Sequence, residues 1–173
     1  MPPRKKTPQE ARELIDSGFV RAGWIFQDRD ELNLQAGRGV AICEFRMKPG
    51  HGFADYLLFV DGRAVGALEA KPAGHPLVGV EAQGDKCAAG LPDTLDAPLR
   101  PLPFVYLSNG DETRFTNLLD PEPRSRPLFN VHQPETLAGH LKGDAIEAWV
   151  RAGSEPHAAM GAPAYQLRGH SPH

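Results

Sequence analysis

Three charged side chains lie in two short apolar runs near the middle of the chain. Asp55 is near the start of the first run, and Glu69 and Lys71 are at the end of the second. Burying an unpaired carboxylate costs roughly several kcal/mol, so two carboxylates in such segments need a compensating partner. A divalent cation between them provides one, because Mg²⁺ prefers carboxylate oxygens as ligands. The spacing Asp-x13-Glu-x-Lys therefore indicates metal-assisted hydrolysis.

The pair Asp61-Gly62 joins the two runs and predicts a β-hairpin. The register of this hairpin decides whether the three charged residues share a face of the sheet. A strict two-residue loop places Asp55 and Glu69 on opposite faces. A three-residue connection, with Gly62 at positive φ in a bulge, places all three charged residues on one face. The hydrolytic site requires the bulged turn, and these residues alone also fit a hairpin whose end charges are merely solvated.

Length and composition place the chain among ordinary globular proteins. Its 173 residues are enough for one full core. No secretory signal and no run of about 18 apolar residues is present, so a cytoplasmic protein outside the membrane is expected. Cys43 and Cys87 lack the spacing of a zinc site and are expected to be reduced thiols. A net charge of −3 does not indicate nucleic-acid binding, so any DNA contact needs a local basic patch or a partner.

The remaining patterns predict alternating strands and helices. Thr7-Pro8-Gln9-Glu10 begins a helix, in which Glu10 either closes a capping box or takes part in catalysis. Strands are expected at 24–26, 40–47, 104–107 and 114–117, and helices at 78–91, from Pro134 and at 144–151. The proline-rich segment 121–127 cannot be helical. Residues 1–152 are expected to form one domain, followed at 153–173 by a flexible tail or a truncated junction towards a missing segment.

Taken in order, these segments resemble the amino-terminal nuclease domain of the restriction (R) subunit of type I restriction-modification enzymes. The resemblance runs from Thr7 to Leu137 and rests on an ordered set of short blocks. They include Asn33-Leu-x-Ala-Gly-Arg-Gly-Val40, Gly50-His-Gly-Phe-Ala-Asp-Tyr56, Glu69-Ala-Lys71-Pro72, Glu112-Thr-Arg-Phe-Thr-Asn117 and Asp120-Pro-x-Pro-Arg-Ser-Arg126.

The resemblance implies the PD-(D/E)XK nuclease fold, which is an α/β fold with a restriction-endonuclease-like mixed β-sheet flanked by helices. In that fold Asp55, Glu69 and Lys71 form the catalytic signature, and Asp55 and Glu69 hold Mg²⁺. A cation there activates the phosphate and the attacking water. Lys71 then orients the attacking hydroxide or offsets charge on the transition state, although a salt bridge to either acid is its alternative role.

The family implies further site residues. Glu10 is the best match to an acidic residue on the first helix near the metal. Gln83 matches the glutamine of a Gln-x-x-x-Tyr element, in which Cys87 replaces the tyrosine and puts the efficiency of cleavage in question. Three arginines at the rim of the sheet are expected to contact DNA phosphates: Arg114, Arg124 and Arg126. The alternative is that they are ordinary solvated loop residues.

The first functional hypothesis is a Mg²⁺-dependent DNA endonuclease domain that acts on double-stranded DNA with modification and specificity subunits. The chain has no Gly-x4-Gly-Lys-Ser/Thr motif, so no ATP site is expected in it. The alternative is a non-catalytic DNA-binding or docking remnant of such a subunit, and a third is an unrelated small α/β domain. Whether the isolated chain cuts DNA is left open.

Overall fold

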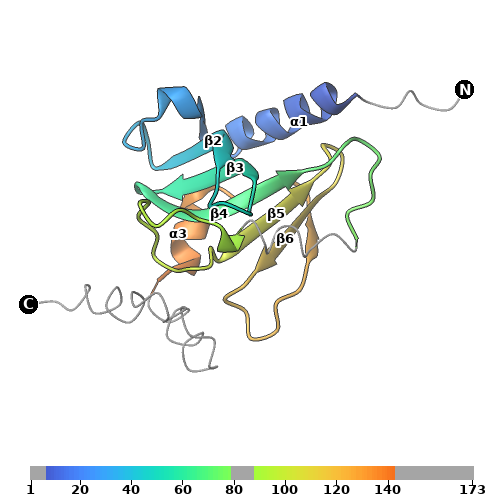
Figure 1. The fold of residues 1–173 in the computed structure, drawn as a ribbon. Coiled ribbons are helices and arrows are strands. Elements are labelled where there is room, and N and C mark those ends of the chain that lie inside the picture. The colour runs from blue at the N-terminus through green and yellow to red at the C-terminus, as the bar shows by residue number, and fades with distance from the viewer. Residues whose placement is uncertain (1–6, 79–87, 143–173) are drawn as a thin grey trace, which may run out of the picture.

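A single mixed β-sheet forms the centre of the computed structural model, which describes residues 7–78 and 88–142 (Figure 1). The order of strands in the sheet is the order in the sequence. β1 with β2 and β4 with β5 are parallel pairs, and the other neighbours are antiparallel. The strands are β1 (Ile25–Asp28), β2 (Gly39–Arg46), β3 (Phe53–Val60), β4 (Arg63–Ala70), β5 (Phe104–Ser108), β6 (Thr113–Asn117) and β7 (Arg126–Leu128).

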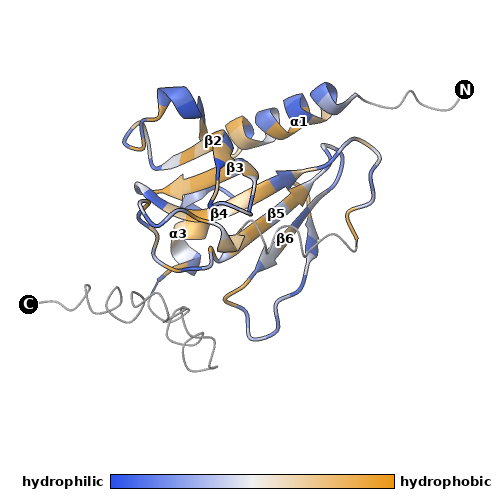
Figure 2. Cartoon of the chain, viewed as in Figure 1, coloured by the Kyte–Doolittle hydropathy of each residue, from blue (hydrophilic) through white to orange (hydrophobic). Residues whose placement is uncertain are grey.

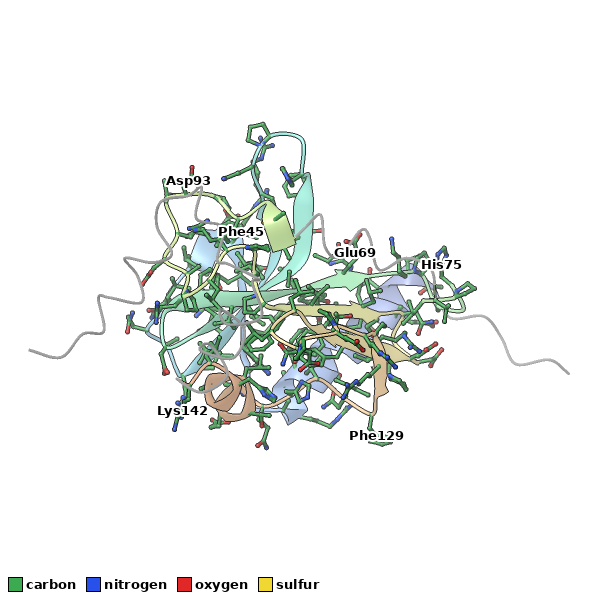
Figure 3. All side chains as sticks on the ribbon, turned by 90° about the horizontal axis from the view of Figure 1, so that it is seen from below. Phe45, Glu69, His75, Asp93, Phe129 and Lys142 are labelled. Carbon is green, nitrogen blue, oxygen red and sulfur yellow. The ribbon has the colours of Figure 1, made fainter. Side chains whose placement is uncertain are left out.

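Two α-helices lie on one face of this sheet, α1 (Pro8–Arg21) and α3 (Pro134–His140). The view from below shows them on the same side, with the segment that carries Asp93 on the other (Figure 3). α1 begins with the predicted capping box, because Glu10 N–H donates to Thr7 Oγ1 and the Glu10 carboxylate accepts the Thr7 N–H. A short 3₁₀ helix, η1 (Arg29–Glu31), follows β1.

The sheet separates two hydrophobic clusters, and its central strands β3, β4 and β5 are its most hydrophobic part (Figure 2). The cluster under the helices includes Phe19 of α1, Leu58 of β3 and Leu137 of α3. The cluster on the opposite face includes Leu57 of β3, with Leu91 and Leu102 from the connection between β4 and β5. Central strands buried on both faces explain why their sequences are continuous apolar runs.

The β3–β4 hairpin has a different turn from the one predicted. Val60 pairs with Arg63, so Asp61-Gly62 is a strict two-residue loop, and both of its residues have positive φ (52° and 82°). That backbone is typical of a type I′ turn. The extra residue is Val65, since Phe59 pairs with Ala64 but Leu58 pairs with Gly66. The predicted bulge at Gly62 was therefore wrong in position.

The displaced bulge gives a register that, continued past the last paired residues, has the parity that a shared site needs. Beyond Val65 the partners are Leu57 with Ala67 and Tyr56 with Leu68. Extending this register by one residue sets Asp55 opposite Glu69. Gly66 explains why the irregularity is accommodated here, because a Cβ on it would lie 2.6 Å from the Phe104 carbonyl oxygen.

The predicted α/β fold with a mixed sheet and flanking helices is confirmed. The strand β7, which is only three residues long and contains a proline, was not predicted. Most of the helix expected at 78–91, the helix at 144–151 and the segment 153–173 lie outside the described residues. Within the described residues, no helix has the length and apolar character that crossing a membrane requires.

Candidate active site at the end of strands β3 and β4

Asp55 lies where β3 and β4 separate. The pairing of the two strands ends at Tyr56 and Leu68. The Lys71 N–H donates to the Ser108 carbonyl on β5, so the Ala70 N–H points the other way, towards β3. It donates to Asp55 Oδ2 at 2.8 Å. The Asp55 carboxylate therefore bridges the gap between the two strands beside the backbone that joins Glu69 to Lys71.

The strand on the other side of Asp55 is irregular as well. On β2, Cys43 pairs with Tyr56 and Phe45 pairs with Ala54, which leaves Glu44 opposite Asp55. Glu44 has a φ of 53°, in the left-handed region that residues other than glycine seldom adopt. Strained backbone of this kind is concentrated at functional sites. Asp55 thus lies between two departures from regular sheet geometry.

Arg12 reaches Asp55 from helix α1. Its Nη2 donates to Asp55 Oδ1 at 2.6 Å, and the two side chains are 35% and 22% exposed. The guanidinium also lies over the Tyr56 ring, with Cζ 5.7 Å from the ring centroid. Burial lowers the pKa of Arg12. The negative charge of Asp55 and the other neighbours of Arg12 together outweigh this effect, so the pKa of Arg12 lies above its ordinary value. Arg12 is a permanent positive charge at this site.

Sequence reasoning did not assign a role to Arg12. It lies 43 positions from Asp55 in the sequence, and only the docking of α1 on the sheet brings the two together. A second contact fixes the same docking, because the Tyr56 hydroxyl donates to Asp16 Oδ1 at 2.5 Å. The available signal was the helical spacing of Arg12 and Asp16, one turn apart on α1.

Glu69 and Lys71 form an ion pair, with Lys71 Nζ 3.6 Å from Glu69 Oε1. Figure 3 shows Glu69 beside β4. The two side chains are 24% and 14% exposed, so they are only partly hydrated. Burial raises the pKa of Glu69, Lys71 opposes this, and the negative charge of Asp55 raises the pKa further. Asp55 and Glu69 are therefore close enough to repel each other.

The other predicted site residues lie outside this group of side chains. Glu10 is engaged in the capping box, where its Oε2 accepts the Thr7 N–H at 2.8 Å. Gln83 and Cys87 lie outside the described residues. Arg124 is exposed and pairs with Glu122 at 3.2 Å. Arg126 is an exposed residue of the short strand β7.

Arg114 has the clearest relation to Glu69. Glu69 pairs with Leu107, and Leu107 pairs with Arg114, so the three residues form one row across β4, β5 and β6. Side chains in one such row project from the same face, and each strand spacing is roughly 4.8 Å. Arg114 Nε donates to Ser125 Oγ at 2.8 Å, which orders the guanidinium.

The donors at this site suit a hard cation. Asp55 and Glu69 offer carboxylate oxygens, with no thiol or imidazole between them, which is the ligand type of Mg²⁺. Their mutual repulsion is a second reason for a cation to bind there. In the part of the chain that the structure describes, no group of three or more His, Cys, Asp or Glu side chains is arranged to hold a metal. Two carboxylates leave several positions to water and substrate, as is common for Mg²⁺.

Comparisons with known proteins point to one family. Residues 29–98 match the family model of the type I restriction enzyme EcoKI endonuclease subunit second domain. The fold is similar to a fragment structure described as an HsdR subunit of a type I restriction enzyme from Vibrio vulnificus YJ016, with a TM-score of 0.61 and 18% sequence identity. The match covers 82% of this chain and 26% of that one, so the chain spans about a quarter of its length. No curated protein matches the chain significantly.

Proposed function

The comparisons confirm the predicted resemblance to the amino-terminal region of a type I restriction enzyme R subunit, and from it we propose that this chain is a Mg²⁺-dependent endonuclease domain. It would hydrolyse phosphodiester bonds of double-stranded DNA in the cytoplasm, in a complex with modification and specificity subunits. The observation that carries the proposal is the grouping of Asp55, Glu69 and Lys71 at the point where β3 and β4 separate.

In this proposal Asp55 and Glu69 hold the cation, which when bound supplies Lewis-acid activation of the phosphate and of the attacking water. The two carboxylates are fixed by different means. Asp55 is oriented by the Ala70 N–H, whereas Glu69 is placed by β4 and its pairing with β5. Fixed ligands avoid reorganisation during the reaction.

Lys71 supplies the positive charge for the reaction itself. Its Nζ is held 3.6 Å from Glu69 Oε1 in a partly buried position, where electrostatic interactions are stronger than in water. An ammonium group there orients the attacking water or stabilises negative charge that develops on the phosphoryl oxygens. Either role strengthens in the transition state, so Lys71 acts on the rate more than on binding.

One observation favours the second candidate function, a non-catalytic DNA-binding or docking domain. Both oxygens of Asp55 already have partners, Arg12 on one and the Ala70 N–H on the other. If these contacts persist in the complex, the site serves to join α1 to the hairpin.

A nicking assay on supercoiled plasmid separates the two functions. The chain would be assembled with its modification and specificity subunits and with the rest of the R subunit, and assayed across a Mg²⁺ titration. We expect Mg²⁺-dependent nicking, loss of nicking in Asp55→Asn, and unchanged nicking in Asp93→Asn, whose carboxylate is exposed and pairs with Lys48. DNA binding without nicking by the wild type at every Mg²⁺ concentration would overturn the endonuclease proposal in favour of the second candidate.

A further inference from the structure

We propose that Arg12 is a built-in counter-ion of Asp55, and that a divalent cation must displace its guanidinium from Asp55 Oδ1 in order to bind. This inference rests on the proposed function, since it concerns the cation held by Asp55 and Glu69. It makes Arg12 a positioning residue that sets the affinity of the site for the cation.

The contact that would be exchanged joins Arg12 to one oxygen of Asp55. Arg12 Nη2 lies 2.6 Å from Asp55 Oδ1, while the other carboxylate oxygen is bound to the Ala70 N–H at 2.8 Å. The backbone bond holds the carboxylate between the strands whether Arg12 is present or not. Arg12 therefore occupies the oxygen that has no backbone donor.

The negative charges at the site explain why Asp55 needs a positive group beside it both with and without metal. Asp55 and Glu69 repel each other, and Lys71 forms an ion pair with Glu69 while Arg12 forms one with Asp55. Arg12 therefore neutralises Asp55 when no metal is bound. A guanidinium and a divalent cation so close together repel, so both cannot occupy the same carboxylate oxygen at low cost.

The Arg12 side chain can leave Asp55 without a rearrangement of the fold. The guanidinium lies over the Tyr56 ring, and the Arg12 side chain is 35% exposed, so it has room to move towards solvent. The helix itself stays docked through the bond from the Tyr56 hydroxyl to Asp16. Displacement would thus need a change of rotamer in Arg12 and no movement of α1.

The test is calorimetric titration of the chain with MgCl₂, comparing wild type with Arg12→Gln, Arg12→Lys and Arg21→Gln. Arg21 is an exposed arginine near the end of the same helix and controls for loss of one positive charge from α1. Removing a unit charge next to the site should lower the Kd for Mg²⁺ about tenfold in Arg12→Gln. Arg12→Lys should stay closer to wild type, and Arg21→Gln should be unchanged.

A second measurement does not depend on a folded variant. In ¹⁵N-labelled wild type, the Arg12 guanidinium signals should show restricted rotation without metal and faster rotation as MgCl₂ is added. Arg12→Lys assigns these signals by their disappearance. Unchanged guanidinium signals on saturation with Mg²⁺ would overturn the exchange.

The outcomes separate this inference from the function on which it rests. Tighter binding of Mg²⁺ by Arg12→Gln supports the exchange, including the case in which wild type binds too weakly to detect. Equal or weaker binding by Arg12→Gln, with clear binding by wild type, refutes the exchange and leaves the proposed metal site standing. Absence of Mg²⁺ binding in both proteins, both folded, would overturn the metal site and the exchange together.

Discussion

Two of the polar clusters among the described residues differ in how their side chains are compensated for burial. The Asp55 cluster, formed by Arg12, Asp55, Glu69 and Lys71, consists of full charges that remain partly exposed. The His132 cluster is built from aromatic and histidine side chains that pack against one another. Its members are Trp24, Tyr106, Phe115, His132 and His140.

Two hydrogen bonds hold the His132 cluster together within the fold. The Tyr106 hydroxyl and His132 Nδ1 are 2.7 Å apart, and Trp24 Nε1 donates to the His132 carbonyl at 2.8 Å. The His132 ring packs edge-on against Phe115, with centroids 4.5 Å apart. Burial raises the pKa of Tyr106 well above its ordinary value, so the hydroxyl stays neutral. This cluster joins β1, β5 and the segment before α3 by permanent contacts.

The difference between the clusters indicates which one is available for chemistry. A neutral, satisfied hydrogen-bond network gains nothing from a ligand. Charges that repel each other and are paired with side chains are stabilised when a cation arrives. We therefore expect changes in the Asp55 cluster to alter function first, and changes in the His132 cluster to alter stability alone.

The largest expected effect comes from Lys71→Ala. If Lys71 stabilises charge in the transition state, its loss should slow single-turnover cleavage about a hundredfold, or about 3 kcal/mol in the barrier. Affinity for DNA should change little. Cleavage in the assembled enzyme and DNA binding at several salt concentrations are the measurements.

Lys142→Ala is the matched control for Lys71→Ala, because Lys142 is an exposed lysine after α3, far from Glu69 in Figure 3. Wild-type cleavage by Lys71→Ala would refute its catalytic role. A defect confined to binding, with a lower salt dependence, would make Lys71 a phosphate contact instead.

Next in size is the stabilisation of the fold by metal. Because the cation should bind the native site and not the unfolded chain, Mg²⁺ at about ten times its Kd should raise the free energy of unfolding by about 1.4 kcal/mol. Asp55→Asn should lose most of this increment, and chelator should reverse it in wild type. Thermal unfolding that is indifferent to Mg²⁺ would remove the main physical support for the metal site.

Tyr106→Phe tests the other cluster. It leaves His132 Nδ1 without its partner in a partly buried position, which should cost about 1 kcal/mol in unfolding free energy by urea denaturation. Cleavage should be unchanged. Tyr56→Phe is the matched loss of a hydroxyl beside the Asp55 cluster, and should cost less because the positive charge of Arg12 also stabilises the partner carboxylate, Asp16. Equal stability losses would contradict the contrast between the clusters.

Local patterns predicted most of the elements but not the details that depend on contacts between distant residues. The capping residues Thr7 and Glu10 predicted the start of α1, and apolar runs predicted the central strands. Asp61-Gly62 predicted the hairpin, but these two residues form the whole turn without the predicted bulge. The bulge lies instead at Val65, next to Gly66, which touches the β5 backbone.

The candidate site could be proposed from the sequence only in part. Spacing and residue type brought out Asp55, Glu69 and Lys71, because charges in apolar strands are conspicuous. Arg12 was not predicted, since nothing local distinguishes it from other arginines on an exposed helix face. Its contact with Asp55 exists only because Phe19 and its neighbours dock α1 on the sheet.

The smallest expected effect is a difference in pH dependence between the clusters. Burial, and then the charge of His140, lower the pKa of His132 in the folded state below its ordinary value of 6.5. The unfolded chain therefore binds more protons near and below pH 6.5, so His132 makes stability fall as pH decreases through that range.

Glu69 has the opposite effect on the pH dependence of stability. Its folded pKa is raised by burial and by Asp55, so its ionisation destabilises the fold as pH increases above the ordinary value of 4.5. The measurement is the free energy of unfolding by urea across pH 4.5 to 7.5. In His132→Asn this free energy should fall less than in wild type as the pH decreases. In Glu69→Gln its gain over wild type should increase with pH. The same pH dependence for both variants would show that the two clusters do not differ in their coupling to folding.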